Sequence, residues 1–131
     1  MLSAAMLLGP GCGASSNRDN VSRDEPLRRA GFRAIAARDY FATCPGAAAG
    51  PEMTYQSARH DELKQLAART GAAETLALGE NEWFGVSRAA PPERCESGDD
   101  AYRAALARYA GALDTLAARI ADYPRPEGQR P

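Results

Sequence analysis

Large apolar side chains recur in a regular pattern towards the C-terminal end of the chain. Alternating spacings of four and three residues place them on one face of an α-helix for about three heptads. Asp99 and Asp100 are expected in the first turn of this helix, Ser97 is a candidate N-cap, and Pro124 is expected to end it. The pattern predicts a long helix that buries one face, formed by Tyr102, Leu106, Tyr109, Leu113, Leu116, Ile120 and Tyr123.

A shorter apolar pattern predicts a first helix over residues 27–43. Asp24 is a candidate N-cap, and Pro26 fits the first turn because its missing amide hydrogen is not needed there. Gly31 either weakens this helix or lets another helix approach it closely. Pro45 disfavours helical geometry in the residue before it, so we expect the helix to end there.

A second helix is predicted from Tyr55 or Ser57 to Thr70, after a loop over residues 47–52. Gly71 follows it, at a position suited to a left-handed C-cap. The two shorter helices need an apolar surface to pack on. We therefore expect the long helix to pack within its own chain rather than against a second copy.

Helical periodicity fails over residues 75–88, which read TLALGENEWFGVSR. Its apolar residues are separated by the turn-like residues Gly79, Glu80 and Asn81. This favours two short extended pieces around a turn, with an irregular loop as the alternative. The expected fold is a small all-α domain over residues 26–123, a three-helix bundle with a long C-terminal helix and a minor β turn around residues 75–88.

The same segment carries the candidate functional surface. In an extended segment Glu80 and Glu82 lie on one face about 7 Å apart, a separation compatible with the paired carboxylates of glycoside-cleaving enzymes. We favour a simpler interpretation, a charged turn that Trp83 anchors to the helices. Because loops on a rigid scaffold carry most sites, Glu80, Asn81, Glu82 and Trp83 remain the candidate binding surface.

Composition and motifs argue against several other classes of function. The 16 basic and 17 acidic residues nearly cancel and are interspersed, which disfavours binding to nucleic acid. His60 is the single histidine, and we expect it to be a surface or packing residue. The chain has no Cys-x-x-Cys, His-x-x-x-His or calcium-loop motif. We therefore predict no catalytic residue, no metal site and no cofactor.

The N-terminal residues MLSAAMLL form an apolar run that is typical of a signal peptide and too short to span a membrane. The following stretch, "LLGPGC", resembles the lipobox of bacterial lipoproteins. This resemblance implies a signal peptide over residues 1–11 and lipidation of Cys12, and Gly13 after the cysteine implies sorting to the outer membrane. Cleavage after Ala14, which releases a soluble protein, is the alternative.

The chain has three cysteines, and an odd number in an exported protein needs an explanation. Lipidation of Cys12 supplies one and leaves Cys44 and Cys95 as a disulfide pair. Cys95 lies in a proline-containing loop that can reach back to the end of the first helix. Closing a loop of about 50 residues stabilises a fold by up to about 4 kcal/mol. The alternative is a cytosolic protein with three free thiols.

Residues 12–25 are small and polar and predict a flexible tether, and residues 124–131 predict a disordered tail. The leading interpretation is an exported protein on the periplasmic side of the bacterial cell envelope, anchored to a membrane by lipid. Its role is expected to be binding or structural rather than catalytic, with another envelope protein or the cell wall as partner. The alternatives are a small cell-wall glycoside hydrolase acting through Glu80 or Glu82, and a cytosolic helical adaptor.

Overall fold

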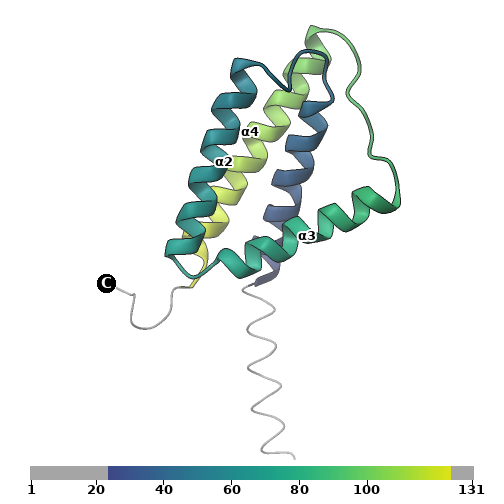
Figure 1. Cartoon of the computed structure of the whole chain (residues 1–131). Coiled ribbons are helices and arrows are strands. Elements are labelled where there is room, and N and C mark those ends of the chain that lie inside the picture. The colour runs from purple at the N-terminus through teal and green to yellow at the C-terminus, as the bar shows by residue number, and fades with distance from the viewer. Residues whose placement is uncertain (1–23, 125–131) are drawn as a thin grey trace, which may run out of the picture.

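The computed structural model describes residues 24–124 and shows an all-helical bundle with no strand in that range (Figure 1). A helix covers residues 24–42 and is called the 24–42 helix. It is followed by α2 (Pro51–Arg69), α3 (Ala73–Ala89) and α4 (Asp99–Asp122). The 24–42 helix, α2 and α4 run alongside one another, and α3 crosses one end of this group and projects to the side. The predicted all-α class is confirmed.

The prediction for residues 75–88 is wrong, because this segment lies within α3 and is neither extended nor an irregular loop. The buried residues of α3 are Thr75, Leu76, Gly79 and Glu80. Their spacing is helical, but one is a glycine and another is a glutamate. A search for apolar residues at helical spacing could not detect a face built in this way.

Several predicted helix ends also differ from the structure. Asp24 is already helical and its Oδ1 accepts a hydrogen bond of 2.8 Å from the Tyr123 hydroxyl, so it is not an N-cap. The N-cap of α4 is Gly98 rather than Ser97, because the chain enters the helix at a φ of 112° that favours glycine. Asp24 and Glu25 were also assigned to the tether, yet both are helical.

The N-terminal end of α2 falls earlier in the chain than predicted, whereas its C-terminal end falls close to the predicted position. It begins at Pro51, before Tyr55, because proline is favoured in the first turn and Gly50 serves as N-cap. It ends at Arg69, followed by Gly71 with a φ of 80°. The Ala72 N–H donates to the Ala67 carbonyl at 2.8 Å, the bond expected of a glycine C-cap.

The predicted buried face of α4, which we call the seam, forms the centre of the core. Tyr109, Leu113, Leu116 and Ile120 are buried, whereas the seam residues nearest the two ends of the helix are partly buried against them. Other elements of the same chain supply the facing side chains, including Leu27, Ala34 and Phe41 of the 24–42 helix. The long helix therefore packs within its own chain, as expected.

Two glycines allow α3 to cross the 24–42 helix at close range. A Cβ atom on Gly79 would lie 2.0 Å from the Arg28 carbonyl oxygen. A Cβ atom on Gly31 would lie 2.6 Å from Leu76 Cδ1 and 3.0 Å from the Leu76 carbonyl oxygen. Gly31 therefore serves the close approach that was one of its two expected roles.

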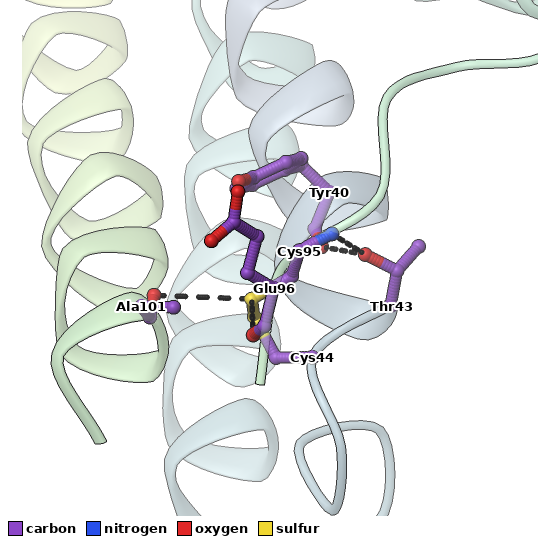
Figure 2. The surroundings of a disulfide bond; sticks show 6 residues. All are labelled: Tyr40, Thr43, Cys44, Cys95, Glu96 and Ala101. Atoms are coloured by element: carbon purple, nitrogen blue, oxygen red, sulfur yellow. Dashed lines mark hydrogen bonds between the residues drawn. A yellow bond between two sulfur atoms is a disulfide. The ribbon is translucent and has the colours of Figure 1, made fainter. Parts of the chain in front are cut away.

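A disulfide between Cys44 and Cys95 ties the segment before α4 to the end of the 24–42 helix, as predicted (Figure 2). Their Cα atoms are 4.8 Å apart, although the residues are separated by 51 positions in sequence. The Thr43 hydroxyl donates to the Tyr40 carbonyl at 2.7 Å and accepts from the Cys95 N–H at 2.8 Å. These bonds hold both ends of the disulfide in place.

Candidate functional site

The structure separates the two glutamates that were paired in the sequence-based hypothesis. Positions two apart on a helix point in different directions, so Glu80 turns inwards and Glu82 turns out to solvent. Glu82 forms an ion pair with Arg28 of the 24–42 helix. The proposed face of two neighbouring carboxylates does not exist on α3, because it required an extended backbone.

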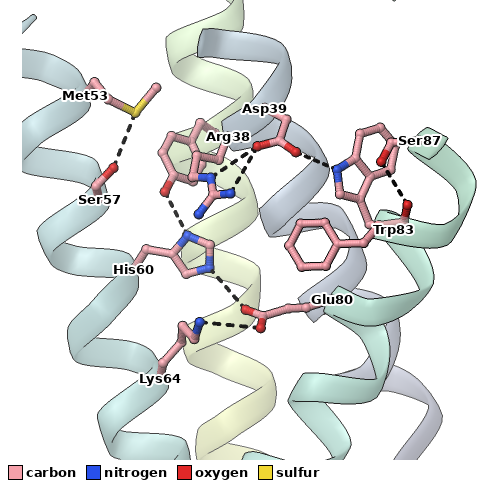
Figure 3. Close-up of polar contacts among 11 residues, drawn as sticks. Arg38, Asp39, Met53, Ser57, His60, Lys64, Glu80, Trp83 and Ser87 are labelled. Carbon is pink, nitrogen blue, oxygen red and sulfur yellow. Dashed lines mark hydrogen bonds and ion pairs between the residues drawn. The ribbon is translucent and has the colours of Figure 1, made fainter. Parts of the chain in front are cut away.

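Glu80 instead joins a polar cluster between α2, α3 and α4, in which Lys64 is exposed and the other members are buried (Figure 3). One of its oxygens lies 3.4 Å from Lys64 Nζ, and the other lies 3.9 Å from His60 Nε2. His60 Nδ1 shares a hydrogen bond of 2.8 Å with the Tyr109 hydroxyl. We call Glu80, Lys64, His60 and Tyr109 the polar cluster.

Burial determines the ionisation of His60 and Tyr109. His60 is 3% exposed, and its burial, with the nearby charges of Arg38 and Lys64, lowers its pKa to about 4. Burial also raises the pKa of Tyr109 to about 12. Both groups are therefore neutral near pH 7, and the contact between His60 and Glu80 is not an ion pair there. Because His60, Tyr109 and Glu80 are buried from solvent, we assign them a structural role.

Asn81 and Trp83, the other members of the candidate surface, have different surroundings. Asn81 is exposed, whereas Trp83 is half-buried against the 24–42 helix. The Trp83 Nε1–H donates to Asp39 Oδ2 at 2.7 Å, and its ring meets Phe32 edge-on with ring centres 5.7 Å apart. Trp83 therefore does anchor its segment to the bundle, although the segment is a helix rather than a turn.

Trp83 also borders a surface pocket of about 580 Å³, which we call the groove. It lies along the 24–42 helix and α4, and is bordered by Trp83 and by Pro92 and Glu93 of the connecting segment 90–98. Small residues make up much of its lining: Ala30, Ala36, Ala37, Gly111 and Ala112. Small side chains leave the space open, because they do not fill the distance between the two helix surfaces.

Aromatic and charged side chains complete the groove. Phe32, Tyr40 and Trp83 contribute rings, and Arg33 and Arg108 contribute guanidinium groups. The Arg108 guanidinium carbon lies 4.7 Å from the centre of the Tyr40 ring, a cation–π contact. Within residues 24–124, neither Arg33 nor Arg108 forms an ion pair with a carboxylate.

Sequence reasoning missed the groove. Arg33 and Arg108 are 75 positions apart, and nothing in their local patterns indicates that they line the same space. The usable signal was the helical spacing of small residues on the first predicted helix, such as Ala30 and Ala37.

The described part of the chain contains no group of three or more His, Cys, Asp or Glu side chains placed to hold a metal ion. None of its helices combines the length and the apolar character needed to span a membrane. Comparison of the chain with family models, curated proteins and solved structures finds no match in any of the three. The predicted signal peptide, Cys12 and the C-terminal tail lie outside the described residues, as does most of the tether.

Proposed function

We propose that this protein acts in the bacterial cell envelope, anchored to a membrane through Cys12, and that its helical domain binds a ligand rather than catalysing a reaction. The observation that carries this proposal is the disulfide between Cys44 and Cys95. Structural disulfides form and persist in oxidising compartments, including the bacterial periplasm, and are rare in the cytosol.

Cysteine pairing supports lipidation of the remaining thiol. With Cys44 and Cys95 joined, Cys12 is the single cysteine without an assigned partner in the chain. It also follows an apolar run in a stretch that resembles a lipobox. One modification therefore accounts for both the odd cysteine and the N-terminal pattern.

The groove supports a binding role. Its volume of about 580 Å³ lies within the usual range for small-molecule sites, roughly 300 to 1,000 Å³. Its walls are helices of a disulfide-linked bundle, and a rigid site needs little ordering when a ligand binds. The titratable groups of the polar cluster, by contrast, do not line the groove, and His60, Glu80 and Tyr109 are buried inside the bundle.

Intact-mass analysis of the protein from the membrane fraction of its native host tests the anchor and the disulfide together. We expect a chain that begins at Cys12 with added acyl mass, and two thiols that react with an alkylating agent only after reduction. A Cys12→Ala variant is the matched control and should lose both the acyl mass and the membrane association.

Two other results would overturn the proposal in different ways. A chain that begins after Ala14 without acyl mass would preserve export but remove the membrane anchor. A full-length chain with three free thiols would place the protein in the cytosol and remove the basis for both.

A further inference from the structure

The two arginines of the groove are its most informative side chains. Arg33 and Arg108 are exposed and, among the described residues, have no carboxylate partner, although the domain pairs several of its other arginines. Glu93 is the one acidic side chain in the lining. The groove therefore carries an excess of positive charge and favours an anionic ligand.

The rest of the lining requires that the ligand also have an apolar body. Ala36, Ala37 and Ala112 offer no side-chain hydrogen bonds, and Phe32 and Trp83 present aromatic carbon. A small hydrated anion such as acetate or phosphate would contact the arginines but leave these surfaces uncovered. Covering apolar surface adds favourable free energy in proportion to the area removed from water.

Backbone hydrogen bonding favours an acyl chain over an extended peptide. The two long walls of the groove are the 24–42 helix and α4, whose backbone N–H and C=O groups are used within the helices. A peptide lying between them would lose water from its own backbone groups without gaining protein partners, which is costly. A hydrocarbon chain has no such groups to satisfy.

Aromatic side chains of the groove are held in place before any ligand binds. Asp39 fixes the Trp83 indole through its N–H, Phe32 packs against the indole edge-on, and Arg108 lies over the Tyr40 ring. Because these side chains are already ordered, a ligand would lose little free energy in immobilising them.

From these observations we infer that the groove binds a single-chain amphipathic carboxylate, with its acyl chain along the small-residue lining and its carboxylate paired with a guanidinium group of that lining, Arg33 or Arg108. This inference rests on the binding role proposed above and names the class of ligand. It does not depend on the membrane anchor.

Titration of the full-length protein with decanoate tests the inference, followed by the emission of Trp83 and by calorimetry. Trp83 is the single tryptophan of the chain and borders the groove, so its emission reports on this site. We expect saturable binding of decanoate. Decyltrimethylammonium, which has the same chain length but opposite charge, should bind at least about tenfold more weakly, and acetate should cause no saturable change.

Variants separate the contribution of charge from that of shape. The double variant Arg33→Gln/Arg108→Gln should weaken decanoate binding by at least about tenfold, since no guanidinium group is then left in the groove to pair with the carboxylate. Arg103→Gln is the matched control, because Arg103 is an exposed arginine of α4 outside the groove, and it should leave the affinity unchanged.

A second variant blocks the groove without disturbing the fold. A Cβ atom added to Gly111 would meet no atom within 4 Å, so the Gly111→Leu variant should fold. Because Gly111 lines the groove, the leucine side chain should occupy part of it. We expect this variant to lose decanoate binding, with an unchanged far-ultraviolet circular dichroism spectrum. Gly85→Leu, at an equally open position of α3, is the control and should bind normally.

The inference is overturned if decanoate causes no saturable change, or if decyltrimethylammonium or acetate binds as well as decanoate. It is also overturned if the double arginine variant or Gly111→Leu retains full affinity. None of these results would affect the anchor or the disulfide, which mass analysis tests separately.

Discussion

His60 illustrates how burial determines the chemistry of a single side chain in this bundle. Its imidazole shares one hydrogen bond with Tyr109 and faces the carboxylate of Glu80 at 3.9 Å. The neutral form is favoured because a charged imidazole at this depth would lose its hydration and lie near the cationic groups of Arg38 and Lys64. The chain's single histidine is therefore a neutral packing residue at pH 7.

Acidification should destabilise the fold through His60. The unfolded chain takes up the proton near the usual pKa of 6.5, whereas the folded chain does so only at about 4. Between these values the unfolded state binds more protons, so the free energy of unfolding falls as the pH is lowered from 6.5 to about 4. The loss should approach about 3 kcal/mol.

Thermal and urea melts at several pH values across this window measure the effect, with His60→Asn as the comparison. Asn places an amide near the position of Nδ1, but it does not titrate. Carboxylates titrate in both proteins, so the difference between the two pH profiles isolates His60. Identical profiles for the two proteins would contradict the prediction.

At the scale of elements, α3 shows how a helix can lack an apolar stripe and still pack. Its inward face includes Gly79, which lies against the backbone of Arg28, and Glu80, which joins the polar cluster. Trp83 extends the same face and bonds to Asp39. The helix is therefore held by close backbone contact and polar partners as well as by Leu76.

Gly79→Ala should destabilise the protein by about 2 kcal/mol or more. The added methyl group would lie 2.0 Å from the Arg28 carbonyl oxygen, so the two helices would have to move apart. The control is Gly85→Ala on the same helix, where nothing lies within 4 Å of the new atom. That change should stabilise the helix by roughly 0.5 to 1 kcal/mol.

Denaturant melts of both variants measure these free energies of unfolding. Because each change replaces glycine with alanine in α3, their effects on helix propensity largely cancel in the comparison. Changes of the same sign and size in the two variants would show that Gly79 is not a site of close contact.

At the scale of the whole molecule, the disulfide compensates for the small size of the domain. A domain of about 100 residues leaves a large part of its surface exposed and has limited free energy of unfolding. The bond between Cys44 and Cys95 ties the exposed segment 90–98 to the bundle, and so restrains the connection between α3 and α4.

Reduction should lower the melting temperature by at least several degrees, because closing a loop of this length stabilises the fold by up to about 4 kcal/mol. Differential scanning calorimetry with and without a reductant measures the change. The double variant Cys44→Ala/Cys95→Ala is expected to melt at the lower temperature in both conditions. A wild-type melting temperature that does not respond to complete reduction would contradict the role assigned to the disulfide.

Particular residues show how far sequence reasoning could reach. The α4 seam was predicted because Tyr109, Leu113 and Leu116 are large, apolar and regularly spaced, and the same spacing decides which face they bury. Cysteine counting predicted the pair Cys44 and Cys95. Of the candidate surface, Trp83 alone borders the groove. The backbone of its segment was predicted wrongly, since Gly79 and Glu80 read locally as turn residues.

The sequence by itself determined the helical class and the buried face of α4, because periodicity can be read without knowing how the helices pack. Cysteine counting favoured the pair Cys44 and Cys95 over three free thiols, and the structure contains that disulfide. Only the tertiary structure decided that Glu80 faces His60, that Gly79 touches the backbone of Arg28, and that Arg33 and Arg108 share one groove. Each of these contacts joins residues far apart in the chain. Their proximity depends on the angles and depths at which the helices cross, and local side-chain patterns do not encode those quantities.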